Sequence, residues 1–95
     1  MADKKETRSI TLINRYGLHV RPAGLFAKTA SSYDADVTVE KDGVEVSGKS
    51  IMALMTLEAM SGSVLKVTAE GPEAAEVLDE LEALVARKFD IPDEQ

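Results

Sequence analysis

The sequence predicts an α+β fold, a two-layer open-faced sandwich in which a four-stranded sheet is covered by helices on one face. Short runs of alternating apolar and polar residues predict half-buried strands, and apolar residues at i, i+3, i+4 and i+7 predict amphipathic helices. These patterns follow in the order β-α-β-β-α-β-α over 95 residues, a length that fits one domain. We expect an ordered core over residues 7–88 and flexible ends at residues 1–6 and 90–95.

The first strand is expected over residues 7–13, where Ile10 and Leu12 alternate with polar residues. A loop at residues 14–17 follows. Pro22 then suits the first turn of a helix, where its missing N–H would have no partner in any case. The apolar stripe of this helix consists of Ala23, Phe26, Ala27 and Ala30.

A hairpin should follow, because two alternating runs around residues 37–39 and 44–46 are separated by Asp42-Gly43. Ser50 is then well placed to cap a second helix that runs to about Met60 and is ended by Gly62.

The last two elements are a fourth strand over residues 64–69 and a final helix opened by residues 71–73. Arg87 and Lys88 lie at the helix end that the dipole favours for cations. The apolar stripe of this helix consists of Val77, Leu78, Leu81, Leu84 and Val85.

Composition excludes several classes of function. With no cysteine and one histidine, the chain offers no disulfide and no plausible transition-metal site, and we expect no cofactor. A net charge of −6 and only four aromatic residues argue against nucleic acid as a partner. No apolar run approaches the length of a membrane span, and the N-terminal residues do not resemble a signal peptide, so we expect a cytoplasmic protein.

Charge is distributed unevenly along the chain. Residues 70–95 contain nine acidic and two basic residues, whereas residues 15–28 contain Arg15, Arg21 and Lys28 and no acid. This basic stretch surrounds the only histidine, His19. It indicates a site for an anion or an acidic partner surface, with chance clustering as the alternative.

His19 is the candidate catalytic residue. It lies between a loop and the first turn of a helix, where unpaired N–H groups and the helix dipole favour an anion. Its neutral imidazole is a nucleophile, and the planar guanidinium of Arg21 could hold phosphate oxygens. The alternatives are that His19 is an ordinary packing or surface residue and that Arg21 is a solvated charge.

Two helix faces form a candidate partner-binding surface. Opposite the core stripe of the first helix lie Val20, Gly24 and Lys28; in the second helix, Leu54 and Leu57 point away from a cluster of Ile51, Met52 and Met55. An exposed apolar cluster marks an interaction site, and methionine suits a surface that accepts several partners. The alternative is that both faces of each helix are buried.

Two segments resemble a known family. Residues 17–23 (GLHVRPA) resemble the active-site signature of HPr, the histidine-containing phosphocarrier of the bacterial phosphoenolpyruvate-dependent phosphotransferase system, and residues 48–55 (GKSIMALM) resemble its regulatory-serine segment. The likeness extends over about residues 7–87. It implies an antiparallel sheet of order 1-4-2-3 under three helices. Gly24 and Glu58 stand where the family often has other small residues.

The resemblance implies a role for each site residue. His19 would be phosphorylated on Nδ1 by enzyme I and would pass the phosphate to sugar-specific enzyme IIA domains or to regulatory targets, with Arg21 holding the phosphoryl group. Ser50, which by its spacing alone is only a helix cap, would be a regulatory site for HPr kinase/phosphorylase. The docking surface would comprise Val20, Gly24, Lys28, Ile51, Met52 and Met55.

Three other functions remain as alternatives. The first is the family's nitrogen-related paralogue, which serves regulatory partners only. The second is a small-ligand-binding regulatory module, and the third is a hydrolase that would use His19 with Ser47 or Ser50.

Overall fold

The computed structural model describes residues 4–92. The chain forms β1 (Lys5–Thr11), α1 (Val20–Ser31), β2 (Asp36–Lys41), β3 (Val44–Ser47), α2 (Ile51–Met55), β4 (Val64–Glu70) and α3 (Ala74–Ala86). A short 3₁₀ turn, η1, follows at Lys88–Asp90.

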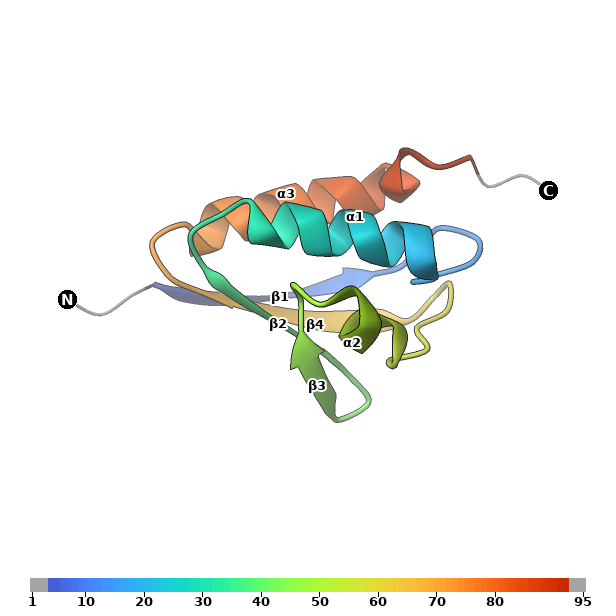
Figure 1. The fold of residues 1–95 in the computed structure, drawn as a ribbon, viewed down its shortest axis with the longest axis horizontal. Coiled ribbons are helices and arrows are strands. Elements are labelled where there is room, and N and C mark those ends of the chain that lie inside the picture. The colour runs from blue at the N-terminus through green and yellow to red at the C-terminus, as the bar shows by residue number, and fades with distance from the viewer. Residues whose placement is uncertain (1–3, 93–95) are drawn as a thin grey trace.

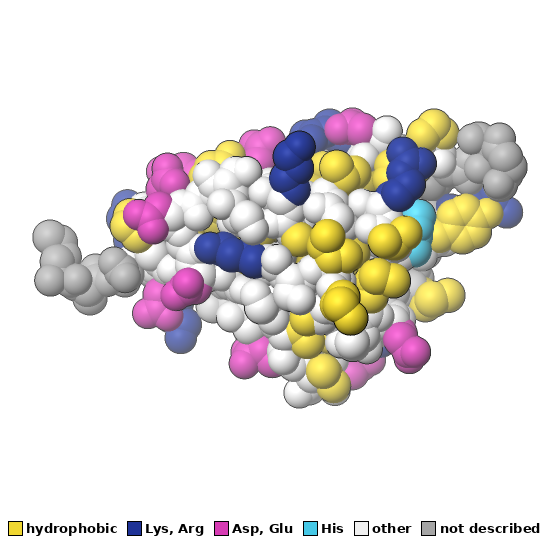
Figure 2. Space-filling model, viewed as in Figure 1, with side chains coloured by type: hydrophobic (Ala, Val, Ile, Leu, Met, Phe, Trp, Pro, Cys, Tyr) yellow, Lys and Arg dark blue, Asp and Glu magenta, His cyan; other side chains and the backbone are white. Residues whose placement is uncertain are grey.

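The four strands form one antiparallel sheet in the order β1-β4-β2-β3. The helices cover one face, with α1 and α3 lying side by side across it (Figure 1). This arrangement confirms the predicted sandwich and strand order. In the same view, hydrophobic side chains gather over the end of the molecule where α1 begins (Figure 2).

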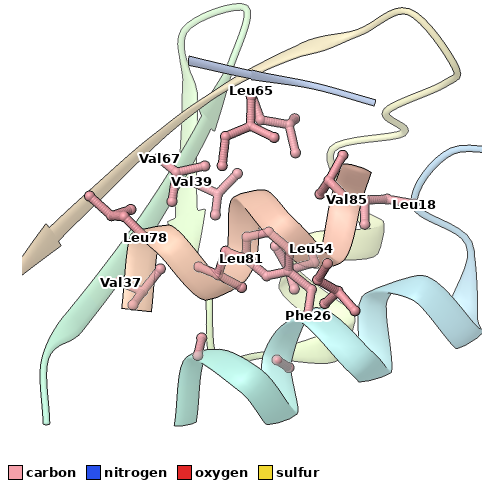
Figure 3. Packing of buried hydrophobic residues seen from close by; sticks show 14 of the residues in the cluster. Leu18, Phe26, Val37, Val39, Leu54, Leu65, Val67, Leu78, Leu81 and Val85 are labelled. Atoms are coloured by element: carbon pink, nitrogen blue, oxygen red, sulfur yellow. The ribbon is translucent and has the colours of Figure 1, made fainter. Parts of the chain in front are cut away.

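A single hydrophobic core lies between the sheet and the helices (Figure 3). Every residue of the predicted stripes of α1 and α3 is buried in it, as are the alternating strand residues Ile10, Val37 and Val39. At one side of the core, Arg8 of β1 pairs with Asp79 and Glu82 of α3. The hydrogen bond to Asp79 raises the pKa of the Arg8 guanidinium above its ordinary value.

Element ends differ from the predicted ends. β1 covers Lys5–Thr11 rather than residues 7–13, since its pairing partner β4 begins at Val64, opposite Thr11. The helix α1 begins two residues before Pro22, which still lies in the first turn. The hairpin turn is as predicted, with Asp42 and Gly43 both at positive φ.

The predicted extent of the second helix is wrong. Instead of continuing to about Met60, α2 ends at Met55, and Glu58 takes a positive φ of 51° that is incompatible with a continuing helix. Gly62 therefore belongs to the turn before β4 rather than to the end of α2.

The chain end after α3 is partly ordered. Arg87 and Lys88 lie just beyond α3, and the Arg87 Nε–H group donates to both carboxylate oxygens of Asp90 at 3.2 Å. Phe89 is only 1% exposed and belongs to the core. Of the ends expected to be flexible, residues 1–3 and 93–95 lie outside the described residues, whereas Lys5 and Glu6 are part of β1.

Within residues 4–92, none of the helices has the length and apolar character that crossing a bilayer requires.

Candidate functional site

His19 is the N-cap residue of α1. Its backbone is extended (φ −81°, ψ −172°), and its side chain makes no capping hydrogen bond. The imidazole is therefore not used to satisfy the helix end. Among the described residues, the N–H groups of Val20 and Arg21 have no acceptor, and Pro22 has no N–H. The first turn of α1 thus presents unpaired donors and the positive end of its dipole beside the imidazole.

Gly17 allows the loop before His19 to approach the segment after α2. Its φ is +67°, and a Cβ on it would lie 2.2 Å from the carbonyl oxygen of Ala59. The next residue, Leu18, donates its N–H to this same oxygen at 2.9 Å. A glycine is required because both the positive φ and the close approach exclude a side chain.

Asn14 fixes the same loop from inside. It is the one buried polar residue among those described, and its Nδ2 group donates to the carbonyl oxygen of Gly17 at 2.8 Å. Its Oδ1 atom is buried without a partner among the described residues. The loop is therefore tied at both Gly17 and Leu18, and His19 follows directly from a rigid backbone.

Tyr16 contacts the imidazole. The rings of Tyr16 and His19 meet edge to face, with centroids 6.1 Å apart and an interplanar angle of 89°. The guanidinium carbon of Arg15 lies 5.3 Å from the centre of the Tyr16 ring. This T-shaped contact limits rotation of the imidazole without engaging its nitrogens.

His19 borders an open hollow between this loop and the end of α2. The hollow is lined by Tyr16, Leu18, His19, Met55, Glu58, Ala59 and Met60. Of these residues, Tyr16, Leu18, Glu58, Ala59 and Met60 were not predicted as site residues. For Tyr16, the one signal in the sequence was its position three residues before His19. For Met60 there was no signal, because the second helix was wrongly predicted to extend to that residue.

Arg21 is the second residue of α1 and is exposed. Its guanidinium makes no hydrogen bond or ion pair with any of residues 4–92. It lines a shallow hollow together with Val20, Gly24, Leu25 and Lys28. Arg21 is thus an uncommitted cation two residues from His19.

The predicted docking surface is exposed and continuous between α1 and α2. Val20 is 57% and Met52 is 80% exposed, and Ile51 and Met55 are exposed beside them, while Leu54 and Leu57 point into the core as predicted. A Cβ on Gly24 would lie 3.9 Å from Cδ1 of Ile51, so the two helices meet at this glycine. Hydrophobic side chains form a cluster there, with the single histidine at its edge and Lys and Arg side chains around it (Figure 2).

Ser50 is the N-cap of α2, as predicted. Its hydroxyl accepts the N–H of Ala53 at 3.1 Å. Because Ser50 immediately precedes Ile51 and Met52, any group added to its hydroxyl lies at the docking surface.

No group of three or more metal-ligating side chains occurs within the part of the chain that the structure describes. What the site offers is an accessible imidazole, free backbone N–H groups and an unpaired guanidinium. These groups define a class of protein with an anion-binding site, suited to a small, highly charged group such as a phosphate, beside a nitrogen nucleophile.

Comparison with known proteins identifies the family. Residues 6–87 match the family model described as "PTS HPr component phosphorylation site". The chain is 41% identical over 78 residues to the phosphocarrier protein HPr of Vibrio cholerae, covering 82% of this chain and 92% of the relative. It is 44% identical over 69 residues to the HPr-like protein Crh of Bacillus subtilis, covering 73% and 81%.

Solved structures agree with this assignment. HPr from Thermoanaerobacter tengcongensis superposes with a TM-score of 0.88 at 40% identity, covering 92% of this chain and 98% of that one. The chain belongs to the HPr family, and it is a phosphoryl carrier rather than an enzyme. Family membership favours the carrier over the ligand-binding module and the hydrolase.

Gly17→Ala should destabilise the protein by at least about 2 kcal/mol, because it combines a strained φ with a backbone clash at Ala59. The matched control is Gly43→Ala, which has a φ of +86° but no atom within 4 Å of the added Cβ. Gly43→Ala should cost only about 1 kcal/mol. Urea unfolding of both variants measures the difference in the free energy of unfolding. Equal losses of stability would show that the contact with Ala59 is unimportant.

Proposed function

We propose that His19 accepts a phosphoryl group from enzyme I and passes it to enzyme IIA domains or to regulatory acceptors. The observation that carries this proposal is the position of His19 at the helix N-cap with its side chain uncommitted. A histidine in that position has both an open approach for a partner and donors ready for the incoming phosphate oxygens.

The transfer exchanges the donor's bond to phosphorus for an N–P bond on His19. A lone pair on Nδ1 of His19, the nitrogen that the family resemblance implies, attacks the phosphorus of the donor's phosphoryl group, and the donor's bond to phosphorus breaks as the new one forms. The donor's leaving atom takes up a proton, and His19 loses one. Because phosphoryl transfer depends mainly on positioning and charge stabilisation, the N–H groups of Val20 and Arg21 and the Arg21 guanidinium suffice to hold the group.

Docking of the partners is assigned to the surface formed by Val20, Gly24, Lys28, Ile51, Met52 and Met55. Its apolar centre supplies contact area, and Arg21, Lys28 and Lys49 are exposed cations near it. An acidic partner surface complements this arrangement, as expected for enzyme I. One surface serving donor and acceptors in turn also explains its flexible methionines.

Ser50 is proposed as a regulatory phosphorylation site for HPr kinase/phosphorylase. A phosphate there would add a charge of about −1.5 to −2 at a helix N-terminus, which tolerates it. The same charge would lie within the docking surface and would repel an acidic partner. Its effect is therefore on docking rather than on folding.

Incubation with enzyme I and phosphoenolpyruvate should introduce one acid-labile, alkali-stable phosphate per chain. His19→Ala should abolish this labelling, because the nucleophile is lost, while circular dichroism remains unchanged. Tyr16→Phe, which keeps the ring against the imidazole, should still be labelled. Intact mass spectrometry measures the addition of roughly 80 Da, the mass of one phosphoryl group. Phosphate that persists on His19→Ala would refute the assignment.

Arg21→Ala should slow transfer from enzyme I about tenfold or more, since a charge-assisted hydrogen bond to the phosphate is lost. Because Arg21 is unpaired within the described residues, the thermal midpoint should not fall. Lys28→Ala serves as the control for loss of one positive charge from α1. Rapid-quench kinetics checks the prediction, and an equal slowing in both variants would assign Arg21 to general electrostatics only.

Ser50→Asp should raise the KM for enzyme I several-fold, whereas Ser50→Asn should not. Both side chains can cap α2, so the two variants differ in charge but not in the hydrogen bond to Ala53. Steady-state phosphorylation assays at low salt measure the contrast. If Ser50→Asn impairs transfer as much as Ser50→Asp, shape rather than charge is responsible.

A further inference from the structure

Glu58 occupies a strained backbone position beside His19. Its φ is +51°, in the left-handed region that glycine enters without cost and other residues enter at a penalty. The strain belongs to the turn that ends α2 and leads to Ala59, the residue bonded to the His19 loop. Packing does not explain why a charged residue occupies this position, because the Glu58 side chain is exposed.

Glu58 is one of the residues that line the hollow that His19 borders. Its carboxylate forms no ion pair or hydrogen bond with any of the described residues, so its charge is not neutralised locally. Arg21, by contrast, lines the neighbouring hollow on α1. The acidic residue thus shares the hollow of His19, whereas the cation lines the hollow that contains the next residue, Val20.

We propose that Glu58 raises the phosphoryl-transfer potential of phosphorylated His19. This inference rests on the proposed phosphorylation of that residue. Glu58 shares the hollow with an unmodified imidazole before transfer and with a phosphate of about two negative charges after it. It therefore destabilises the phosphorylated state selectively and favours donation to the next acceptor.

The expected size follows from electrostatics in a wet site. In general, one charge acting on two charges across about one screening length (~8 Å) shifts an equilibrium by roughly two- to fivefold. Arg21 and the helix N-terminus retain the phosphate, and Glu58 limits how firmly it is retained. The balance between these two effects keeps the phosphoryl group bound to His19 but still transferable.

The test is a competition between two proteins for a limiting amount of phosphate. Unlabelled variant and ¹⁵N-labelled unmodified protein are mixed with a catalytic amount of enzyme I and limiting phosphoenolpyruvate. The exchange moves a phosphoryl group from one His19 to the other, so bonds and protons balance. Enzyme I acts here only as a catalyst, so differences in how the two proteins dock on it do not change the final equilibrium. Intact mass spectrometry then measures the ratio of the phosphorylated variant to the phosphorylated unmodified protein.

Glu58→Gln, which keeps the Cβ and removes the charge, should take up two to five times as much phosphate as the unmodified protein. Glu58→Gly, which also relieves the strained φ, should show the same ratio. Glu45→Gln on β3 removes an equal charge from an exposed position that does not line the His19 hollow, and should give a ratio of one. At 1 M salt, where the screening length falls to about 3 Å, all ratios should approach one.

A ratio of one for Glu58→Gln at low salt would overturn the proposal, as would a shift that persists at 1 M salt or appears only with Glu58→Gly. If the proposed phosphorylation of His19 is itself wrong, the result is different: the unmodified protein carries no phosphate on His19.

Discussion

The site depends on one close backbone contact, the hydrogen bond from the N–H of Leu18 to the carbonyl oxygen of Ala59 at 2.9 Å. It joins the loop before α1 to the segment after α2, and Gly17 is the residue that makes the approach sterically possible. Because the contact joins segments next to the two helices that carry the proposed docking surface, the imidazole is fixed relative to that surface. A carrier needs this fixed relation, since its nucleophile must enter several partner active sites in the same orientation.

Stability and function are carried by different residues. The sheet and the inward stripes of α1 and α3 form the core, whereas His19 and Arg21 contribute side chains that bond to nothing in the described chain. These two side chains remain available for chemistry because the fold does not use them in hydrogen bonds or ion pairs among the described residues. The exceptions are Gly17 and Asn14, which hold the loop and therefore link the stability of the fold to the geometry of the site.

Sequence periodicity predicted the parts of the molecule that depend on local patterns. The stripe Ala23, Phe26, Ala27 and Ala30 and the Asp42-Gly43 turn are as expected, because burial and turn conformation follow from residue spacing and type. The hollow beside His19 was not predictable, because it depends on where α2 ends. That end is set by the left-handed conformation of Glu58 and by a contact between Leu18 and Ala59, which are far apart in the sequence, so that local patterns do not reveal it.

The place of Ser50 in the fold explains how a modification could regulate docking without disturbing the structure. Its hydroxyl caps α2 through Ala53, and the helix that it caps is short and leaves Ile51, Met52 and Met55 exposed. A helix N-terminus accommodates negative charge, so added phosphate would leave α2 in place. An interface accommodates the same charge poorly when the partner is acidic. The two effects arise at one atom. A helix cap within the proposed docking surface would therefore control association without changing His19, the proposed phosphoryl acceptor.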